Sequence, residues 1–563
     1  RFFYGALRSQ VEGALEEIDR ERIVTRIWAR SHSVWSDRSD EIVNRLGWLD
    51  IAVRMDEERH CIDALLQDLQ QEGYTQAVLL GMGGSSLAPE VFARTFGNGP
   101  MTLRILDSTH PAAVQGLADS LDPARTLFIV ATKSGTTAET LSLFKYFHKQ
   151  LQDQLGEAEA GAHFVAITDA GSELVKLGQA CRFRAVFIND PNIGGRYSAL
   201  SHFGLIPAAL VGVNLRRMLR RAIETKNDCG RHITGSLNPG AQIGVVMAEM
   251  AKAGRDKLTV IADEEVASFA DWLEQLIAES TGKSGTGIVP VVGEPAASPE
   301  AYGADRLFVH LQWSDAGAQD ARVQALIDAG HPVIRVRFRD RYDLGGQFFL
   351  WEFATAVAGA RLGIHPFDQP DVESAKQQSR QMMSAYMKSG SLPAPQPSLE
   401  AGGLKVYLGD GDGERPPGSA VEALAAFVNQ AAAGDYISIQ AYVRPCLPVS
   451  RLLGTLQGCL RDRTKLATTI GYGPRFLHST GQLHKGDRGN GLFIQLTDRP
   501  PADADIPDEP GSAASAVPFG VLIQAQSLGD RQALMDAGRR VLRIDLGEEA
   551  QSELERLVSS LAA

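Results

Sequence analysis

Glu279 is the residue of this sequence whose setting is best suited to a catalytic base. It lies in the segment Glu279–Lys283 (ESTGK), at the end of the apolar run DWLEQLIA, in a chain of 563 residues. Partial desolvation at such a place raises the pKa of a carboxyl toward that of a working general base. The alternative is a solvated carboxylate at a helix end. Two upstream segments, Gly81–Leu87 and Thr132–Thr137, have the composition of oxyanion-binding loops. A base next to such loops indicates proton abstraction from a phosphorylated small molecule.

The two loops offer a phosphate both backbone amides and hydroxyls. GMGGSSL at 81–87 follows the apolar run AVLL, TKSGTT at 132–137 follows LFIVA, and each precedes a helical pattern. A loop between a parallel strand and a helix presents free N–H groups, and glycine lets the backbone approach an anion closely. The alternatives are a tight turn for the first loop and Ser/Thr helix capping for the second. The second loop lacks the Walker A spacing, so nucleotide phosphoryl transfer is not indicated.

Two further segments carry polar side chains for a ligand. Gly194–Ser198 (GGRYS) places the guanidinium of Arg196 next to two glycines, where no side chain blocks the backbone. This setting suits an enediolate or phosphate oxygen. His365–Gln378 combines a proline-bounded turn with a helical pattern, and its Gln369 and Lys376 are both able to face a ligand. Taken alone, each segment is also explained by a turn or helix with solvated side chains.

Length and composition limit the class of protein. A chain of this length with 44% hydrophobic and 22% charged residues is typical of a globular protein of about three domains. The net charge of -12 argues against a nucleic-acid-binding surface. The five cysteines lack the spacing of a metal site, so a reducing cytoplasm is the expected location. No apolar run approaches the ~20 residues that span a membrane. Because the chain starts without methionine in a segment that reads as a helix, RFFYGALRSQVEGAL, we expect a longer precursor.

Short apolar runs that alternate with amphipathic segments predict an α/β fold, with parallel sheets covered by helices on both faces in three layers. We predict a helical segment over residues 1–75 and α/β domains over 76–235 and 236–388. A Pro/Gly-rich linker over 389–403 then leads to a third α/β domain over 404–563. The predicted strands are Ala77–Leu80, Leu103–Leu106, Leu127–Ala131, Phe164–Ile167, Ala185–Ile188, Leu258–Ala262, Leu307–Leu311, Val333–Phe338, Tyr436–Ile439, Leu492–Leu496, Gly520–Ile523 and Val541–Ile544.

The third predicted domain resembles a copy of the second. Gln324–Phe338 (QALIDAGHPVIRVRF) parallels Gln532–Leu546 (QALMDAGRRVLRIDL), and Arg306–Gln312 (RLFVHLQ) parallels Gly491–Thr497 (GLFIQLT). Helix, glycine and strand recur in register, although a helix followed by a strand is common to any two α/β units. The extra residues of the second copy fall in DRPPADADIPDEPGSAASAV. We therefore predict a duplication.

Together these motifs resemble the phosphoglucose isomerase family, which interconverts glucose 6-phosphate and fructose 6-phosphate. The similarity covers the glycine loop, the TKSGTT loop, GGRYS, ESTGK and HPFDQPDVESAK, in the same order and at similar spacing. It implies a pair of sugar-isomerase (SIS) domains. The chain is most similar to the isomerase half of bacterial transaldolase–phosphoglucose isomerase fusion proteins, which implies an N-terminal transaldolase domain in the full-length protein.

The resemblance also implies a role for each matching residue. Glu279 would move the proton between C2 and C1, Arg196 would stabilise the enediolate, and Lys376 would lie near the ring oxygen. The reaction needs no metal and no redox cofactor. His365 and Asp371 depart from the family, which has Asn and Gly at these positions. The implied substrate-binding residues are Gly84, Ser85, Thr132, Lys133, Ser134, Thr137, Gly195 and Gln369.

A ring-opening histidine is missing from its expected place. In the family it follows the base and reaches the site from the partner subunit of a dimer. Here that region reads EPAASPEAYGADR, with Glu300 as the nearest polar candidate. The third domain contains FLHSTGQLHKG, in which His478 has the matching setting. We expect a homodimer or a pseudo-dimeric monomer in which His478 acts in cis; a purely structural His478 is the alternative.

Two other functions stay open at this point. An isomerase that acts on both glucose and mannose phosphates has the same residues, and activity on mannose 6-phosphate would identify it. A non-catalytic sugar-phosphate-binding regulator shares the fold. The presence of both Glu279 and Lys376 argues against the regulator.

Overall fold

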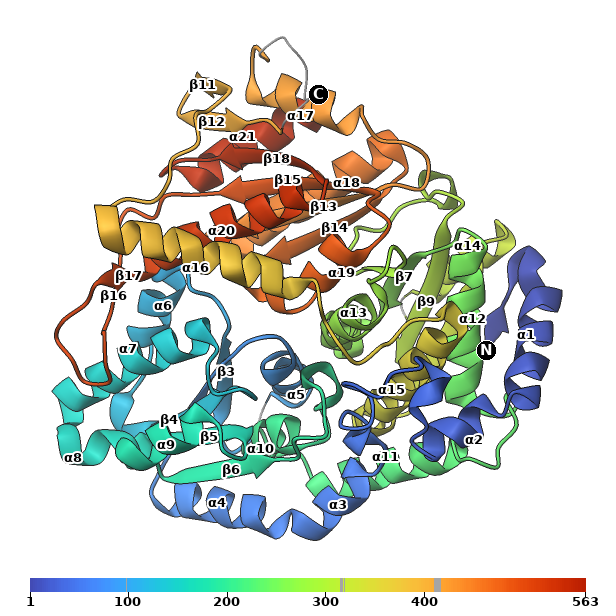
Figure 1. Cartoon of the computed structure of the whole chain (residues 1–563), viewed down its shortest axis with the longest axis horizontal. Coiled ribbons are helices and arrows are strands. Elements are labelled where there is room, and N and C mark those ends of the chain that lie inside the picture. Colours follow the sequence, from blue (N-terminus) through green and yellow to red (C-terminus); the bar gives the residue numbers. More distant parts are fainter. Residues whose placement is uncertain (98, 314–316, 318, 410–416, 563) are drawn as a thin grey trace.

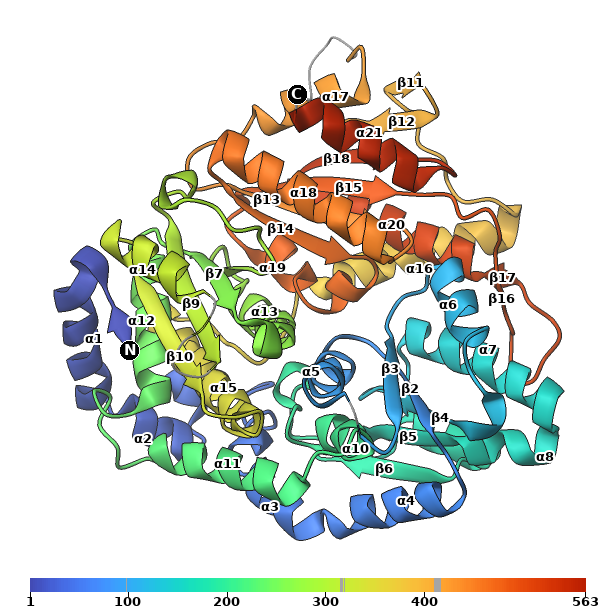
Figure 2. The same cartoon turned by 180° about the vertical axis from the view of Figure 1, so that it is seen from behind.

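Three parallel-sheet units surround a common centre in the computed structural model of the chain, as Figure 1 shows, and Figure 2 shows the same arrangement from behind. The structure describes residues 1–97, 99–313, 317, 319–409 and 417–562. The described helices that matter for the site are α5 (Leu87–Phe96), α7 (Ala138–Leu155), α13 (Ala267–Thr281), α16 (Val372–Ser389), α19 (Gly481–Gly486) and α20 (Phe519–Asp536). The others are α1 (Arg8–Arg20), α2 (Ile23–Trp28), α3 (Ile51–Glu58), α4 (His60–Gln71), α6 (Pro111–Ala118), α8 (Glu157–Ala160), α9 (Glu173–Ala180), α10 (His202–Leu210), α11 (Leu215–Asp228), α12 (Pro239–Lys252), α14 (Asp320–Asp328), α15 (Asp343–Leu362), α17 (Ala420–Val428), α18 (Leu447–Thr464) and α21 (Ala550–Ala562).

The sheet of the first unit is parallel throughout and buried on both faces. Its order is β3-β2-β4-β5-β6. Alternate side chains explain the continuous apolar runs, since Leu79 packs into one core while Val78 and Leu80 pack into another on the opposite face. The strands are β2 (Gln76–Gly81), β3 (Thr102–Leu106), β4 (Thr126–Ala131), β5 (Phe164–Asp169) and β6 (Ala185–Asn189).

The sheets of the second and third units have the same strand order. The parallel strands run β10-β9-β7-β8 in the second unit and β18-β15-β13-β14 in the third, and an antiparallel strand borders β10 and β18 alike. The second sheet consists of β1 (Phe2–Phe3), β7 (Lys257–Ala262), β8 (Val289–Val291), β9 (Arg306–Trp313) and β10 (Val333–Phe338). The third consists of β11 (Leu399–Ala401), β12 (Leu404–Tyr407), β13 (Tyr436–Tyr442), β14 (Ala467–Tyr472), β15 (Gly491–Thr497) and β18 (Arg540–Asp545).

The predicted α/β class is confirmed, and several local predictions are wrong. Gly520–Ile523 forms the start of α20 and not a strand, because a short apolar run does not distinguish a strand from a buried helix. The first residues are not helical: Phe2–Phe3 form β1, which completes the second sheet through backbone hydrogen bonds. Strands β8 and β14 were not predicted, and β11 lies within the predicted linker.

Apolar contacts join the third unit to the other two. Between β15 and α20 the chain makes a small hairpin, β16 (Asp505–Ile506) and β17 (Val517–Pro518), which lies against α7 of the first unit. Ile506 and Phe519 are buried in the same core as the first unit's Phe144. On the other side, Tyr436 and Ala278 belong to one core that the second and third units share. The three units are therefore packed together and not merely linked.

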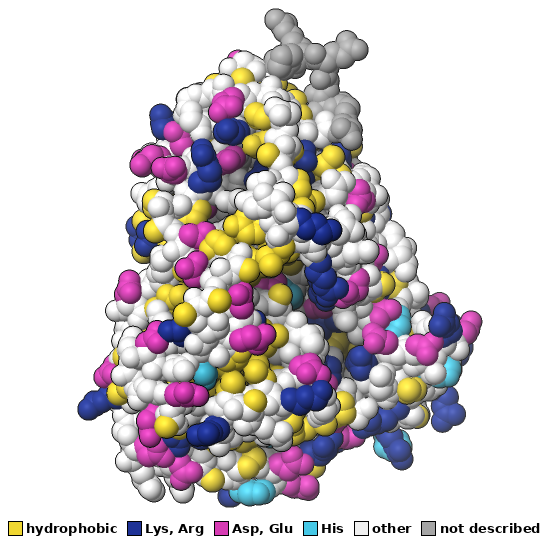
Figure 3. Space-filling view, turned by 60° about the vertical axis from the view of Figure 1, so that its left-hand side comes forward, with side chains coloured by type: hydrophobic (Ala, Val, Ile, Leu, Met, Phe, Trp, Pro, Cys, Tyr) yellow, Lys and Arg dark blue, Asp and Glu magenta, His cyan; other side chains and the backbone are white. Residues whose placement is uncertain are grey.

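The outer surface carries mixed charges. On the face shown in Figure 3, Lys and Arg side chains are interspersed with Asp and Glu side chains. Among the helices of the described residues, none is long and apolar enough to cross a membrane.

Candidate active site

Arg196 and Glu279 meet at the junction of the first and second units. Glu279 lies in the last turn of α13, and Arg196 lies on the short 3-10 turn Gly195–Tyr197. Their side chains form an ion pair, with Arg196 Nη1 3.2 Å from Glu279 Oε1. The Arg196 side chain is only 2% exposed, whereas the Glu279 side chain is 14% exposed. The structure therefore brings together the predicted base and the predicted enediolate-binding cation.

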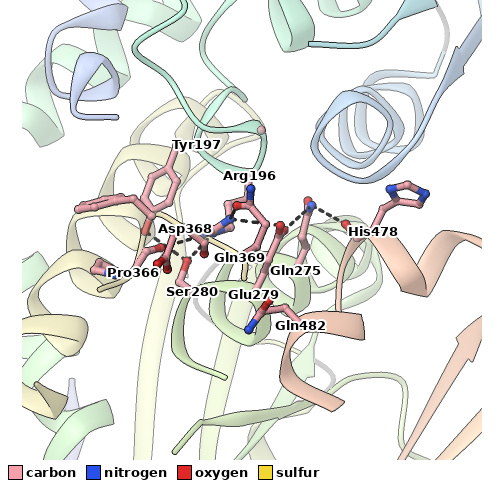
Figure 4. A network of polar contacts seen from close by, with 12 residues as sticks. Arg196, Tyr197, Gln275, Glu279, Ser280, Pro366, Asp368, Gln369, His478 and Gln482 are labelled. Atoms are coloured by element: carbon pink, nitrogen blue, oxygen red, sulfur yellow. Dashed lines mark hydrogen bonds and ion pairs between the residues drawn. The ribbon is translucent and has the colours of Figure 1, made fainter. Parts of the chain in front are cut away.

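Fixed partners occupy the other donors of Arg196 (Figure 4). Its Nε donates to Ser280 Oγ at 2.8 Å, and its Nη1 donates to Gln369 Oε1 at 3.1 Å. Its Nη2 donates to the backbone oxygens of Pro366 at 2.6 Å and Asp368 at 3.0 Å. The predicted ligand Gln369 is thus held against the arginine.

Lys283, the last residue of the ESTGK segment, binds the same loop. Its Nζ donates to the Asp368 backbone oxygen at 2.6 Å and to Asp368 Oδ1 at 2.8 Å. Burial, followed by the nearby Arg196, lowers the pKa of Lys283 to about 8 against the opposing effect of Asp368. Lys283 and Arg196 therefore fix the loop that presents Gln369.

Gln275 connects this cluster to the third unit. Its Nε2 donates to Glu279 Oε2 at 3.0 Å and to the backbone oxygen of His478 at 2.8 Å. In Figure 4 the His478 carbonyl faces Gln275, whereas the imidazole lies on the far side of the backbone from Glu279. Gln275 was not predicted from the sequence, although its position four residues before Glu279 places both on one helix face.

The glycines of the GMGGSS loop permit three backbone segments to meet. Gly83 has a positive φ of 54°, and a Cβ there would overlap the backbone oxygen of His478. A Cβ on Gly84 would overlap the backbone of Gly195. The loop therefore touches both the GGR turn and the segment that carries His478. Ser85 ends the short 3-10 turn of this loop and is partly exposed.

The imidazole of His478 enters a cavity of about 540 Å³ between the first unit, α16 and the third unit. Its Nε2 lies 2.9 Å from Oε1 of Glu139, the second residue of α7. Burial raises the pKa of the Glu139 carboxyl, but His478, a backbone hydrogen bond and the nearby Lys376 together outweigh burial, so the pKa lies below its ordinary value. Glu139 was missed in the sequence. The cavity is lined by Ser134, Thr136, Thr137, Ala138, Glu139, Val372, Ala375, Lys376, Ser379, Arg380, Met383, Ser384, Leu477, His478, Lys485, Leu522 and Gln526.

The TKSGTT loop opens into this cavity at the N-terminus of α7. Ser134 and Thr137 line it, and the Thr137 hydroxyl lies 2.8 Å from that of the buried Thr132. Lys133 turns away, because its Nζ forms an ion pair with Asp169 and donates to the Pro191 backbone oxygen at 3.0 Å. The loop thus presents hydroxyls and helix amides, which are the groups that bind a phosphate at a helix N-terminus.

Lys376 lies across the cavity on α16. Its Nζ donates to Glu373 Oε1 at 2.7 Å, so the ammonium is paired on its own helix. Glu300, the polar candidate that follows the base in the sequence, lies exposed in the turn Pro299–Ala301. The structure therefore gathers His478, Lys376 and the hydroxyl loop around one cavity, next to the cluster of Arg196 and Glu279.

The arrangement combines four chemical functions: a carboxylate base, a buried guanidinium, an imidazole paired with a carboxylate, and a hydroxyl-rich helix N-terminus. The base and the guanidinium suit removal of a proton next to a carbonyl and stabilisation of the resulting enediolate. The imidazole–carboxylate pair suits a second proton transfer. Such a set fits the isomerisation of a phosphorylated sugar.

Comparisons with known proteins point to one family. Residues 67–295 match the family model of phosphoglucose isomerase. A glucose-6-phosphate isomerase of Rubrobacter xylanophilus is 28% identical over 420 residues, which cover 65% of this chain and 94% of that protein. A glucose-6-phosphate isomerase of Bacillus thuringiensis is 26% identical over 384 residues, covering 59% of this chain and 85% of the relative.

Two solved structures share the fold. A protein of Thermus thermophilus described as hypothetical aligns with a TM-score of 0.57 and 24% identity, over 68% of this chain and 99% of that one. A glucose-6-phosphate isomerase of Chlamydia trachomatis aligns with a TM-score of 0.52 and 19% identity, over 65% of this chain and 78% of that one. The predicted similarity to phosphoglucose isomerase is confirmed by the family model and by the two relatives named above.

Proposed function

We propose that this chain, a relative of phosphoglucose isomerase, interconverts glucose 6-phosphate and fructose 6-phosphate through a cis-enediol(ate). The observation that carries the proposal is the ion pair of Glu279 with Arg196 beside a cavity that holds His478 and the TKSGTT loop. Gln275, which binds both Glu279 and the His478 backbone, connects the base and the cation to that cavity. The relatives named above are glucose-6-phosphate isomerases, which supports this choice of substrate.

In the proposed mechanism the hydroxyls of Ser134 and Thr137 and the amides at the start of α7 bind the phosphate. His478, held by Glu139, transfers a proton between the anomeric hydroxyl and the ring oxygen, so that the ring C–O bond breaks and the aldehyde forms. Glu279 removes the proton from C2, and the electron pair forms the C1–C2 double bond of the enediolate. Arg196 stabilises its negative oxygen, the hydroxyl proton passes from O2 to O1, and reprotonation at C1 by Glu279 yields the ketose.

The third unit supplies His478 in cis in this proposal. Gln275 binds the His478 backbone, and Gly83 packs directly on it, so the histidine is built into the site of its own chain. A pseudo-dimeric monomer then contains a complete site. Lys376 would leave Glu373 to contact the sugar when substrate binds.

The test is isomerisation of fructose 6-phosphate, coupled to glucose-6-phosphate dehydrogenase, in the wild type and three variants. Glu279→Gln should lower kcat by about 10²–10⁴-fold with little change in KM, as expected for loss of a general base. His478→Ala should lower kcat too, whereas His232→Ala, which removes an exposed histidine, should be neutral.

Each outcome has a distinct meaning. A wild type without activity would overturn the isomerase, and a Glu279→Gln variant within tenfold of wild type would remove Glu279 from its role. Full activity in His478→Ala would show that the third unit supplies no catalytic histidine and has a structural role. Turnover of mannose 6-phosphate at a comparable rate would identify a dual-specificity enzyme.

A further inference from the structure

Gln526 lies behind the pair of His478 and Glu139, in a chain of three hydrogen bonds. Thr109 Oγ1 donates to Gln526 Oε1 at 2.9 Å, and Gln526 Nε2 donates to Glu139 Oε1 at 2.7 Å. Glu139 Oε1 in turn lies 2.9 Å from His478 Nε2. Thr109 is 0% exposed and Gln526 is 4% exposed. Water therefore has little access to compete for these bonds, and each partner has a defined orientation.

The chemistry of the groups fixes the direction of every bond in this chain. A carboxylate only accepts hydrogen bonds, so the amide nitrogen of Gln526 must face Glu139 and its amide oxygen must face Thr109. For the same reason the His478 Nε2 must carry a proton, which leaves Nδ1 as the acceptor of a neutral imidazole. The oxygen of Glu139 that orients the imidazole is thus held by the Gln526 amide.

The chain of hydrogen bonds alternates between two units of the molecule. Thr109 follows β3, and Glu139 begins α7, both in the first unit; Gln526 on α20 and His478 belong to the third. Glu139 therefore receives two donors from the third unit on a single oxygen. If Gln526 only filled space, an apolar side chain of the same length would serve equally well at this buried position.

We infer that Gln526 is a positioning residue for the reaction: it orients and helps to ionise Glu139, which in turn sets the tautomer and direction of His478. The inference rests on the proposed function. Gln526 itself is not required to touch the reacting atoms. The other charged side chains that line the cavity are Lys376, Arg380 and Lys485, and the variants below leave them in place.

The experiment compares Gln526→Leu, Thr109→Val and Gln524→Leu with the wild type, with fructose 6-phosphate as substrate. Gln526→Leu keeps a similar length but removes the donor to Glu139, and kcat should fall ~10- to 100-fold with KM within about twofold. The loss of a donor to the ionised carboxylate should raise the pKa of Glu139, so the acid limb of the kcat–pH profile should move to higher pH. Thr109→Val should give a smaller change in the same direction. Gln524→Leu, a partly exposed glutamine on the same helix, is the matched control and should leave kcat and the profile unchanged.

A second readout does not depend on activity. The His478 imidazole is followed by NMR titration in the wild type and in Gln526→Leu, and its resonances should shift and titrate differently in the variant. An unchanged kcat–pH profile together with an unchanged His478 titration would overturn the positioning role. If Gln526→Leu does not fold, Thr109→Val carries the same test, and an unchanged profile and titration there would overturn it. An inactive wild type would reject the isomerase instead, so the two failures are distinguishable.

Discussion

Single residues show how far the site is organised before a ligand binds. The guanidinium of Arg196 donates to Ser280, Gln369 and two backbone oxygens and also contacts Glu279. Because these partners hold the guanidinium in place, the proposed mechanism would need little rearrangement when negative charge develops on the substrate. The same rigidity makes the contacts around the GGR turn sensitive to small changes.

Gly84→Ala should destabilise the protein, whereas Gly195→Ala should not. A Cβ on Gly84 would overlap the Gly195 backbone, but a Cβ on Gly195 would meet no atom within 4 Å. Forcing an atom into such a contact costs about 1–3 kcal/mol, and we expect Gly84→Ala to lower the free energy of unfolding by ~2 kcal/mol. Urea unfolding measures both variants. Equal midpoints would show that the two backbones are not in close contact.

Lys283 gives the molecule a distinct pH dependence of stability. Burial lowers the pKa of Lys283 from 10.5 to about 8, so between these pH values the folded state binds fewer protons than the unfolded state. The free energy of unfolding of the wild type, relative to Lys283→Met, should therefore rise as the pH increases from about 8 to about 10.5. Urea unfolding of both proteins over this range measures the difference. A flat difference would mean that the ammonium has an ordinary pKa.

The residues found and missed in the sequence differ in how local their signals are. Arg196, Glu279 and Gln369 belong to motifs of neighbouring residues, and the structure brings them together. Gln275 has a helical signal, its spacing of four from Glu279. Gln526 has no local signal, because its partner Glu139 lies 387 positions away in another unit. Sequence patterns predict contacts along one element far better than contacts that tertiary packing creates.

At the scale of elements, fully apolar runs that end in a loop were predicted well as strands. The five strands of the first unit all fall where they were expected, with ends that differ by one or two residues. Strand β8 was missed since its run is short and contains Pro290, which is atypical of a strand. The start of α20 was wrongly predicted as a strand because the polar residues that complete its helical pattern come later. Buried helices and buried strands share the same composition, and only packing separates them.

Arg475 holds the turn that carries His478, and its loss should be costly. Its Nη1 lies 3.2 Å from Asp107 Oδ2, and its Nη2 contacts Glu90 on α5. Burial raises the pKa of Asp107, which Arg475 opposes. Arg475→Met should lower the free energy of unfolding by about 3 kcal/mol, the lower end for buried pairs, since 25% of the side chain is exposed.

The control for this prediction is Arg94→Met. Arg94 also pairs with Glu90, at 3.6 Å, but is 62% exposed. Its loss should cost no more than ~1 kcal/mol. Urea unfolding and kcat of both variants are compared. Equal effects on stability would mean that Arg475 does not anchor the turn.

At the scale of the whole molecule, three sheets surround the candidate site. The sheets of the second and third units have the same strand order, and that of the first unit differs. The second unit contributes Glu279 on α13, while the third, with the same topology, contributes His478. The first unit contributes the hydroxyl loop. The hairpin of β16 and β17 and the shared apolar cores hold this arrangement in one chain.

We therefore expect a monomer to be fully active. Sedimentation velocity at the concentrations of the assay should show one chain per particle, and specific activity should not change on dilution. The reason is that each group of the proposed site lies within one chain. Activity that falls with dilution, together with a dimer in sedimentation, would contradict this expectation.

The direct packing of Gly83 against the His478 backbone has a genetic consequence. When two subunits share a catalytic centre, two different defective alleles can complement each other, since a mixed particle assembles one intact centre. In the proposed site both halves of the centre belong to a single polypeptide. Co-expression of Glu279→Gln with His478→Ala should therefore yield no more isomerase activity than the two alleles expressed apart. Mutations in the two halves should thus fall into one complementation group.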